Sequence, residues 1–139
     1  MHQIKKMALT VALSAVVSGA WAFGVEGLQG DGISEEALSA LAEKHLGNPD
    51  SIAMGRQLFG NTCLFCHGPE GKGSRAPSLV TGPWRPGGGN TPEYMYSVII
   101  HGRPDTIMGS FRESHTDEEI WQIIAFLRDT SDKLAADAK

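Results

Sequence analysis

Residues 63–67 read Cys-Leu-Phe-Cys-His, the most specific pattern in this 139-residue chain. Cys63 and Cys66 are the only cysteines in the sequence, and two residues separate them. His67 follows the second cysteine directly, and Gly68 follows the histidine. Such close spacing brings two thiols and one imidazole to the same place in any fold, so they act as one chemical unit.

The spacing Cys-x-x-Cys-His is typical of the covalent attachment of haem c. Two thiols separated by two residues reach the two vinyl groups of one porphyrin and form thioethers. The histidine then lies under the ring, where a neutral imidazole nitrogen binds iron. We therefore predict one haem c attached through Cys63 and Cys66, with His67 as an iron ligand.

Three other uses of the motif have less support. A zinc site needs two further ligands at matching spacing, and His45, His101 and His115 are scattered. A thioredoxin-type redox pair follows a strand in a βαβ pattern, which this sequence lacks. A disulfide between the two cysteines would close a very small loop and contribute little stability.

Helical patterns surround the motif, and no strand pattern competes with them. Apolar spacing and capping signals predict about four helices: one between Ser34 and Gly47, one over residues 52–60, one between Thr91 and Gly102, and one after the capping box of Thr116 and Glu119. Residues 69–90 are rich in turn formers and are expected to be mostly loop. Long loops in a small domain often wrap around an unseen group, so the pattern favours an all-α chain built around a large apolar cofactor.

Met108 is the predicted second axial ligand of the iron. It lies in a loop rich in glycine and proline over residues 102–109, from which its thioether reaches the far face of the ring. Thioether ligation raises the reduction potential relative to two imidazoles. The alternative for Met108 is a core residue, the role that we expect for Met54 and Met95.

His101 is a rival for the same ligand position. It stands in the last turn of its predicted helix, where an imidazolium also interacts well with the helix dipole. We expect a surface role for His101, and equally for His115 and His45.

With the motif and the helices in place, residues 52–130 resemble the class I cytochromes c. In that family, the helix before the haem motif crosses the C-terminal helix through a glycine and an aromatic residue. Gly55 and Phe59 match this pattern, with apolar residues Ile123, Phe126 and Leu127 on the last helix. The resemblance implies a cytochrome c fold, in which helices and long loops wrap around one covalently bound haem.

The resemblance also assigns a role to Pro77, whose carbonyl would receive the second N–H of the proximal histidine and fix its tautomer. An ordinary loop proline is the alternative. Two features depart from the family. Gly109 follows Met108 where many members have proline, and the ring of lysines on the mitochondrial protein is missing, so its basic docking face is not carried over.

Three features resemble one subgroup more closely: residues 81–85 (Thr-Gly-Pro-Trp-Arg), residues 108–111 (Met-Gly-Ser-Phe), and a formal charge of −4. The subgroup comprises small periplasmic cytochromes that accept electrons from quinoprotein (PQQ-dependent) alcohol dehydrogenases, including methanol dehydrogenases. The resemblance implies an electron carrier, not an enzyme, that passes electrons to another cytochrome or a terminal oxidase. Trp84 and Arg85 are candidate partners of the haem propionates, with a surface turn as the alternative.

The first 22 residues have the character of an export signal. Lys5 and Lys6 precede an apolar stretch over residues 7–17, and residues 20–22 (Ala-Trp-Ala) fit a cleavage site. A retained anchor is the weaker alternative, because the stretch is shorter than the roughly 20 residues that span a bilayer. We expect a periplasmic monomer with no stable membrane insertion after cleavage. Its parts are a signal peptide (1–22), an extension with a short helix (23–48), a cytochrome c domain (49–132) and a C-terminal tail (133–139).

The net charge of the chain and the loop around Met108 limit the functions that the sequence allows. A net negative charge argues against a nucleic-acid binder with a basic face, and it predicts steering towards basic patches on redox partners. The alternative function is a haem sensor or peroxidase-like protein with an exchangeable sixth ligand, because the missing proline after Met108 would loosen that loop.

Overall fold

The computed structural model describes residues 33–84 and 89–139, so the predicted signal peptide and Arg85 lie outside the described residues. The described chain is helical and contains no strand. Its elements are α1 (Glu35–His45), α2 (Pro49–Thr62), α3 (Leu64–His67), the 3-10 turn η1 (Pro69–Gly71), α4 (Pro92–His101) and α5 (Asp117–Asp137). The prediction of an all-α fold is confirmed.

Side-chain caps begin the helices where the sequence predicts them. The Ser34 and Thr91 hydroxyls each accept the backbone N–H three residues further on, both at 3.2 Å. At α5 the capping box is complete: Thr116 Oγ1 accepts the N–H of Glu119 at 3.2 Å, and the Glu119 carboxylate accepts the N–H of Thr116 at 2.8 Å. The predicted starts of α1, α4 and α5 are therefore confirmed.

The boundaries of α2 differ from the prediction. The helix begins at Pro49 because Asn48 Oδ1 accepts the N–H groups of Asp50 and Ser51, at 3.0 and 3.2 Å. Pro49 is thus the first helical residue, where its missing N–H costs nothing. The short helix α3 was not predicted at all, since four residues show no periodicity.

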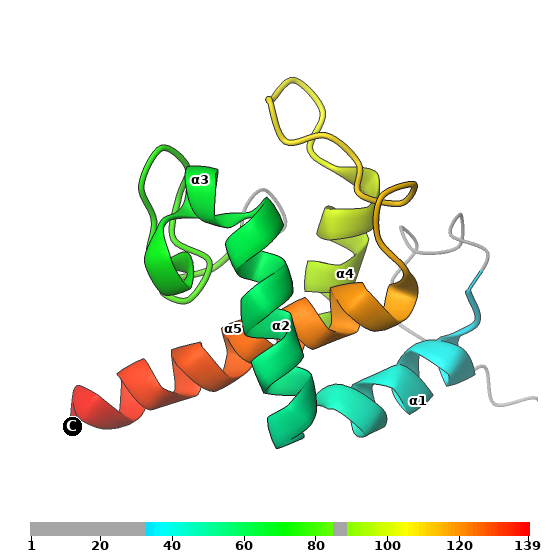
Figure 1. The fold of residues 1–139 in the computed structure, drawn as a ribbon, viewed down its shortest axis with the longest axis horizontal. Coiled ribbons are helices and arrows are strands. Elements are labelled where there is room, and N and C mark those ends of the chain that lie inside the picture. Colours follow the sequence, from blue (N-terminus) through cyan, green and yellow to red (C-terminus); the bar gives the residue numbers. More distant parts are fainter. Residues whose placement is uncertain (1–32, 85–88) are drawn as a thin grey trace, which may run out of the picture.

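The crossing of α2 over α5 is the centre of the fold (Figure 1). A Cβ added at Gly55 would lie 1.9 Å from the carbonyl oxygen of Gln122, so only glycine permits this approach. One turn later the ring of Phe59 packs on Phe126 at 5.5 Å between centroids. The crossing expected from the cytochrome c resemblance is therefore confirmed.

Two side chains have an environment that the sequence did not predict. Met95 is buried as expected, but Met54 is 45 % exposed, because α2 turns Gly55 and Phe59 towards α5 and leaves Met54 outside that contact. His45, expected at the surface, is 2 % exposed. Its ring is satisfied by Ser51 Oγ at 2.9 Å and by Glu118 Oε2 at 2.5 Å, which is why it can be buried.

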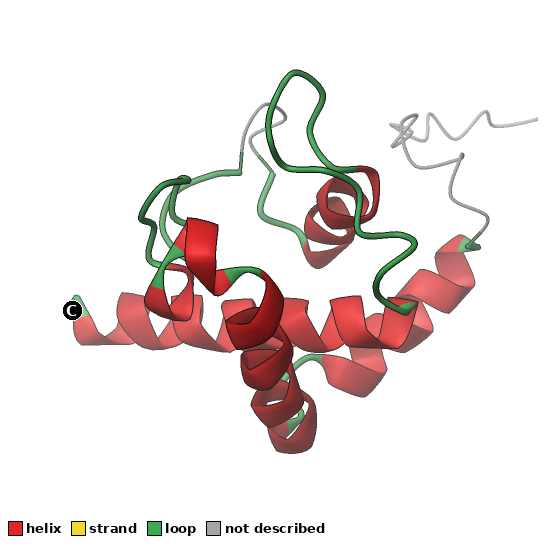
Figure 2. Ribbon diagram, turned by 45° about the horizontal axis from the view of Figure 1, so that its top comes forward, coloured by secondary structure: helices red, strands yellow, loops and turns green. Residues whose placement is uncertain are grey.

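The helices are arranged as a base and an upper end. Helices α1 and α5 lie at the base, whereas α3 and the loop that follows α4 rise together at the other end (Figures 1 and 2). None of the described helices has the length and apolarity to cross a membrane.

Candidate functional site

The motif residues are gathered by the end of α2 and the single turn of α3. Cys63 caps α2 through its N–H, which donates to Phe59 O at 2.8 Å. The N–H groups of Cys66 and His67 then both donate to Cys63 O, at 3.2 and 3.0 Å. These bonds hold two half-buried free thiols and one imidazole on adjacent turns.

Two features shape the chemistry of the Cys63 thiol, its own burial and the neighbouring thiol of Cys66. Burial, with a smaller contribution from neighbouring Cys66, raises the pKa of Cys63 to about 11. In addition, the described residues contain no group of three or more His, Cys, Asp or Glu side chains that could hold a metal ion. Two thiols followed directly by one imidazole are the set of side chains that haem attachment requires.

The orientation of His67 is fixed by the loop that follows it. Its Nδ1 donates to the carbonyl of Pro77 at 3.0 Å, as the cytochrome c resemblance implies. Backbone bonds from Gly73 N to His67 O and from Ala76 N to Cys66 O, at 2.8 and 2.9 Å, close the same loop. Because Nδ1 carries the proton, Nε2 keeps its lone pair and is the nitrogen that can bind iron.

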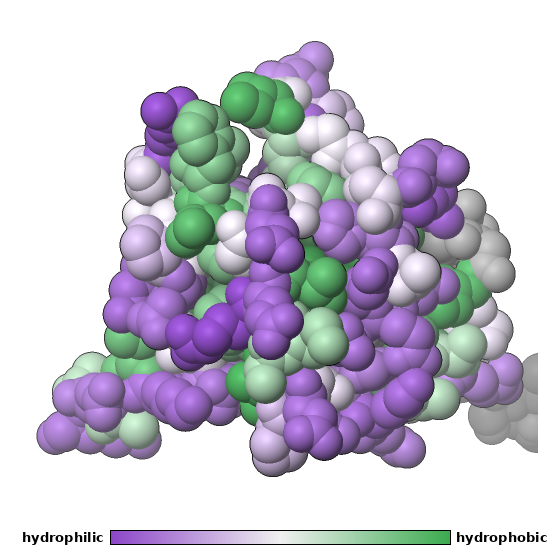
Figure 3. Space-filling view, in the orientation of Figure 1, coloured by the Kyte–Doolittle hydropathy of each residue, from purple (hydrophilic) through white to green (hydrophobic). Residues whose placement is uncertain are grey.

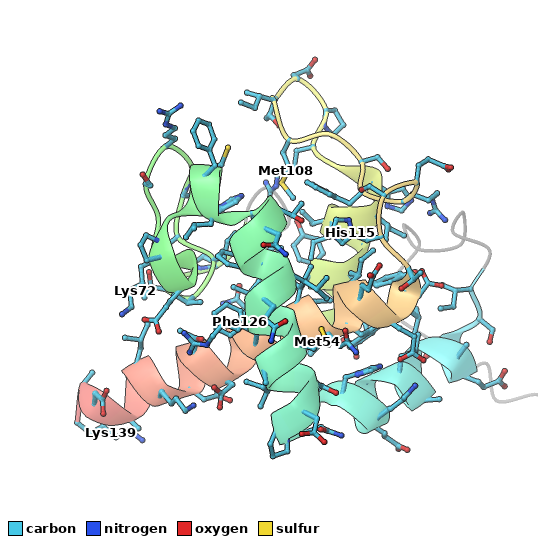
Figure 4. The ribbon with its side chains drawn as sticks, viewed as in Figure 1. Met54, Lys72, Met108, His115, Phe126 and Lys139 are labelled. Carbon is cyan, nitrogen blue, oxygen red and sulfur yellow. The ribbon has the colours of Figure 1, made fainter. Side chains whose placement is uncertain are left out.

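The loop that carries Met108 is held at both ends. It begins at Gly102, where a Cβ would lie 2.5 Å from the carbonyl carbon of Gly109. The N–H of Arg103 donates to Met108 O at 2.8 Å, and the N–H of Met108 donates to Thr106 Oγ1 at 3.2 Å. The Met108 side chain is half-buried against the core and points inward from its loop (Figure 4). This loop is therefore ordered by its own hydrogen bonds, although it lacks the proline common in the family.

Two other candidate residues, Trp84 and His101, are placed differently: the first is buried and the second is exposed. Trp84 is buried, not part of a surface turn, and its indole N–H donates to Leu79 O at 2.9 Å. His101 is exposed as predicted, and its Nδ1 donates to Ser97 O at 2.9 Å.

Sequence reasoning missed one pair of residues beside the motif. The guanidinium of Arg75 lies 4.1 Å from the centroid of the Phe65 ring, and Phe65 is 69 % exposed. No sequence pattern marks such a pair, because the loop that brings Arg75 back to α3 is irregular.

Residues 50–127 match the family described as cytochrome C oxidase, cbb3-type, subunit III. The chain belongs to this family of c-type cytochromes. The cytochrome therefore carries covalently bound haem c, and Cys63 and Cys66 are its only cysteines.

Two curated relatives and two solved structures resemble this cytochrome. The cbb3-type cytochrome c oxidase subunit CcoP of Rubrivivax gelatinosus is 29 % identical over 91 residues, which are 65 % of this chain and 29 % of that protein. Cytochrome c-L of Methylorubrum extorquens is 27 % identical over 84 residues, which are 60 % of this chain and 42 % of that protein. The cytochrome thus spans less than half the length of either relative.

The structural matches confirm the cytochrome c fold. The crystal structure of cytochrome cL from the marine methylotrophic bacterium Methylophaga aminisulfidivorans superposes with a TM-score of 0.54 at 23 % identity, covering 84 % of this chain and 81 % of that one. Cytochrome cL from Hyphomicrobium denitrificans gives a TM-score of 0.53 at 23 % identity, covering 56 % of this chain and 46 % of that one.

Proposed function

We propose that this cytochrome is a periplasmic carrier of single electrons. In this proposal Cys63 and Cys66 would hold one haem c covalently, and His67 and Met108 would supply the ligands of its iron. The observation that supports it best is the bond from His67 Nδ1 to Pro77 O at 3.0 Å, which leaves Nε2 as the nitrogen that would bind iron.

Each part of the site has a role in electron transfer. Bound haem c supplies an iron that alternates between the ferrous and ferric states. The Pro77 carbonyl holds the His67 ring in one tautomer and one orientation, so this ligand need not move when the charge changes. As a ligand, the Met108 thioether would favour the ferrous state and raise the reduction potential. Because His67 and Met108 would both hold the iron, the site would offer no position to a substrate, which favours a carrier over a sensor or a peroxidase.

The remaining sequence-based assignments complete the proposal. Residues 1–22 would direct export, residues 23–48 would form an extension that includes α1, and residues 49–132 would form the cytochrome domain. Residues 133–139, which include the end of α5, would form a C-terminal tail. Arg85 is the proposed partner of a haem propionate. Trp84 was predicted to share this role. Because its indole N–H already donates to Leu79, we assign Trp84 to supporting the loop that precedes Arg85.

The proposed electron donor is a quinoprotein alcohol or methanol dehydrogenase of the periplasm. The match to cytochrome c-L of Methylorubrum extorquens supports this choice, as does the fold shared with cytochrome cL from a methylotrophic bacterium. The acceptor would be another cytochrome or a terminal oxidase, met by a monomeric carrier in small and transient contacts.

The ligand assignment is tested by comparing Met108→Ala with His101→Ala. Met108→Ala should abolish the weak red charge-transfer band of methionine sulfur on ferric iron, lower the reduction potential, and let the ferrous protein bind carbon monoxide at neutral pH. His101→Ala should keep the band, the potential and the resistance to carbon monoxide. Absence of the band from the unmodified protein, with carbon monoxide binding gained only in His101→Ala, would assign the ligand to His101. Carbon monoxide binding by the unmodified protein would favour the sensor or peroxidase alternative.

A further inference from the structure

The direction of the Pro77 carbonyl decides how His67 is held, because this carbonyl oxygen accepts the Nδ1 proton of His67 at 3.0 Å. The pyrrolidine ring fixes φ of Pro77, so the orientation of the peptide between Pro77 and Ser78 depends on ψ of Pro77 and φ of Ser78. Pro77 also has no N–H through which its own backbone could be anchored. The contacts that fix Ser78 therefore aim the carbonyl at the histidine.

Apolar packing contributes little to the segment that leads into Pro77. Its exposed residues are Lys72, Ser74, Arg75 and Pro77. In the space-filling view the surface around Lys72 is hydrophilic (Figures 3 and 4). Because little apolar surface is buried there, hydrogen bonds must hold this part of the loop.

The side chain of Ser78 takes part in four hydrogen bonds of this loop. Its Oγ donates to Gly71 O at 3.3 Å and accepts the backbone N–H groups of Val80 and Thr81, at 3.2 and 3.1 Å. The hydroxyl of Thr81 donates to the same oxygen at 2.8 Å. A serine hydroxyl has one proton and two acceptor lone pairs, so its hydrogen-bonding capacity is fully used here.

The groups on both sides of this hydroxyl are themselves held in place. Gly71 O also accepts the N–H of Leu79 at 2.7 Å, and a Cβ added at Gly71 would lie 2.8 Å from Leu127 Cδ2 on α5. Further along the loop, the buried Trp84 donates its indole N–H to Leu79 O at 2.9 Å. The Ser78 hydroxyl is thus anchored to η1, which packs closely against α5.

We propose that Ser78 is a positioning residue for the iron ligand His67 and acts through the Pro77 carbonyl. Its hydroxyl fixes the peptide whose oxygen receives the Nδ1 proton, and that hydrogen bond orients the imidazole and raises its basicity. A more basic ligand favours ferric over ferrous iron, so the Ser78 hydroxyl lowers the reduction potential. The proposal rests on the proposed function, since it takes His67 to be an iron ligand.

Removal of the hydroxyl from the complete haem protein tests this role. Ser78→Ala should raise the reduction potential. It should also speed solvent exchange of the His67 Nδ1 proton by about fivefold, the factor that corresponds to the loss of one net hydrogen bond. Exchange is followed by nuclear magnetic resonance of the ferrous protein. Ser78→Thr keeps the hydroxyl and should restore both values to those of the unmodified protein.

Ser51→Ala is the matched control, because it removes a buried hydroxyl at the other end of α2, where Ser51 Oγ lies 2.9 Å from His45 Nδ1. It should lower stability but leave the potential and the exchange of the His67 proton unchanged. If Ser78→Ala has the potential and the exchange rate of Ser51→Ala, the proposal is wrong, because the Ser78 hydroxyl then affects stability alone. Equal values for Ser78→Thr and Ser78→Ala would also overturn it.

A milder variant keeps the test decisive if Ser78→Ala does not retain haem. Thr81→Val removes one donor to the Ser78 oxygen at an exposed position, so the fold is at little risk. It should shift the potential and the exchange rate in the same direction as Ser78→Ala, by a smaller amount. Values unchanged from the unmodified protein would then overturn the proposal.

Failure of the proposed function gives a different pattern. If His67 does not bind iron, its ring protons in the unmodified ferric protein show no paramagnetic shift. Ser78→Ala would then speed exchange of the Nδ1 proton without changing the potential, and the ligand assignment would be wrong. Paramagnetically shifted His67 protons, with neither the potential nor the exchange rate altered in Ser78→Ala, would overturn the role of Ser78 alone.

Discussion

The substitution Gly55→Ala tests the crossing of α2 and α5 on which the site is built. The added Cβ would lie 1.9 Å from Gln122 O, whereas real Cβ atoms essentially never approach within 3.0 Å of another heavy atom. The two helix backbones must therefore separate by roughly 1 Å. The contact of Phe59 with Phe126, one turn away, must loosen with them.

The size of the effect follows from two opposing terms. Overpacking of this kind costs about 3 kcal/mol, at the upper end of the usual range, because both groups in the clash are backbone. Replacing glycine by alanine inside a helix stabilises the helix by about 1 kcal/mol, which offsets part of this cost. We therefore expect Gly55→Ala to lower the free energy of unfolding by about 2 kcal/mol.

Gly60→Ala is the matched control, since Gly60 lies in the same helix and has no heavy atom within 4 Å of its would-be Cβ. It should raise the free energy of unfolding by about 0.5–1 kcal/mol. Both variants are measured as oxidised haem protein by guanidinium denaturation, followed by circular dichroism. Equal stabilities for the two alanine variants would refute the close crossing at Gly55.

Two further substitutions test the core and the contact of α1. Phe59→Ala should lower the free energy of unfolding by about 3–5 kcal/mol, because Phe59 is 2 % exposed. In the same denaturation assay, a loss below about 1 kcal/mol would contradict its place in the core. A hydrogen bond from Lys44 lowers the pKa of Glu118 from its ordinary 4.5, and a hydrogen bond from His45 contributes less. This carboxylate therefore stabilises the fold above pH 4.5. Its contribution is lost as the pH falls through the lowered pKa. Glu118→Gln should therefore cost up to about 1 kcal/mol at pH 7 and progressively less as the pH falls below 4.5. Urea denaturation at each pH measures the difference, and a difference that does not change with pH would contradict the linkage.

The sequence predicted those features that depend on neighbouring residues. The capping box of Thr116 and the end of α4 at Gly102 are local, so they could be read from the chain directly. The motif at Cys63, Cys66 and His67 is also local, because its chemistry follows from spacing alone. The resemblance to cytochromes c added what spacing could not give, namely the Pro77 carbonyl as the partner of His67.

The features that were missed depend on contacts between distant segments. The burial of His45 requires Glu118, which lies 73 residues further along the chain. The exposure of Met54 depends on which face of α2 meets α5, and an apolar side chain beside a glycine does not reveal that face. The stacking of Arg75 on Phe65 depends on an irregular loop, whose path follows backbone bonds such as Ala76 N to Cys66 O.

The covalent attachment of haem through Cys63 and Cys66 is tested most directly by extraction with acidified organic solvent. After the protein is matured in a competent periplasm and then denatured, the pigment should stay with the polypeptide. The mass of the chain should exceed that of the peptide by one haem. The double variant Cys63→Ala/Cys66→Ala should release any pigment that it holds. Pigment that passes into the organic phase from the unmodified protein, or a colourless product, would contradict the account.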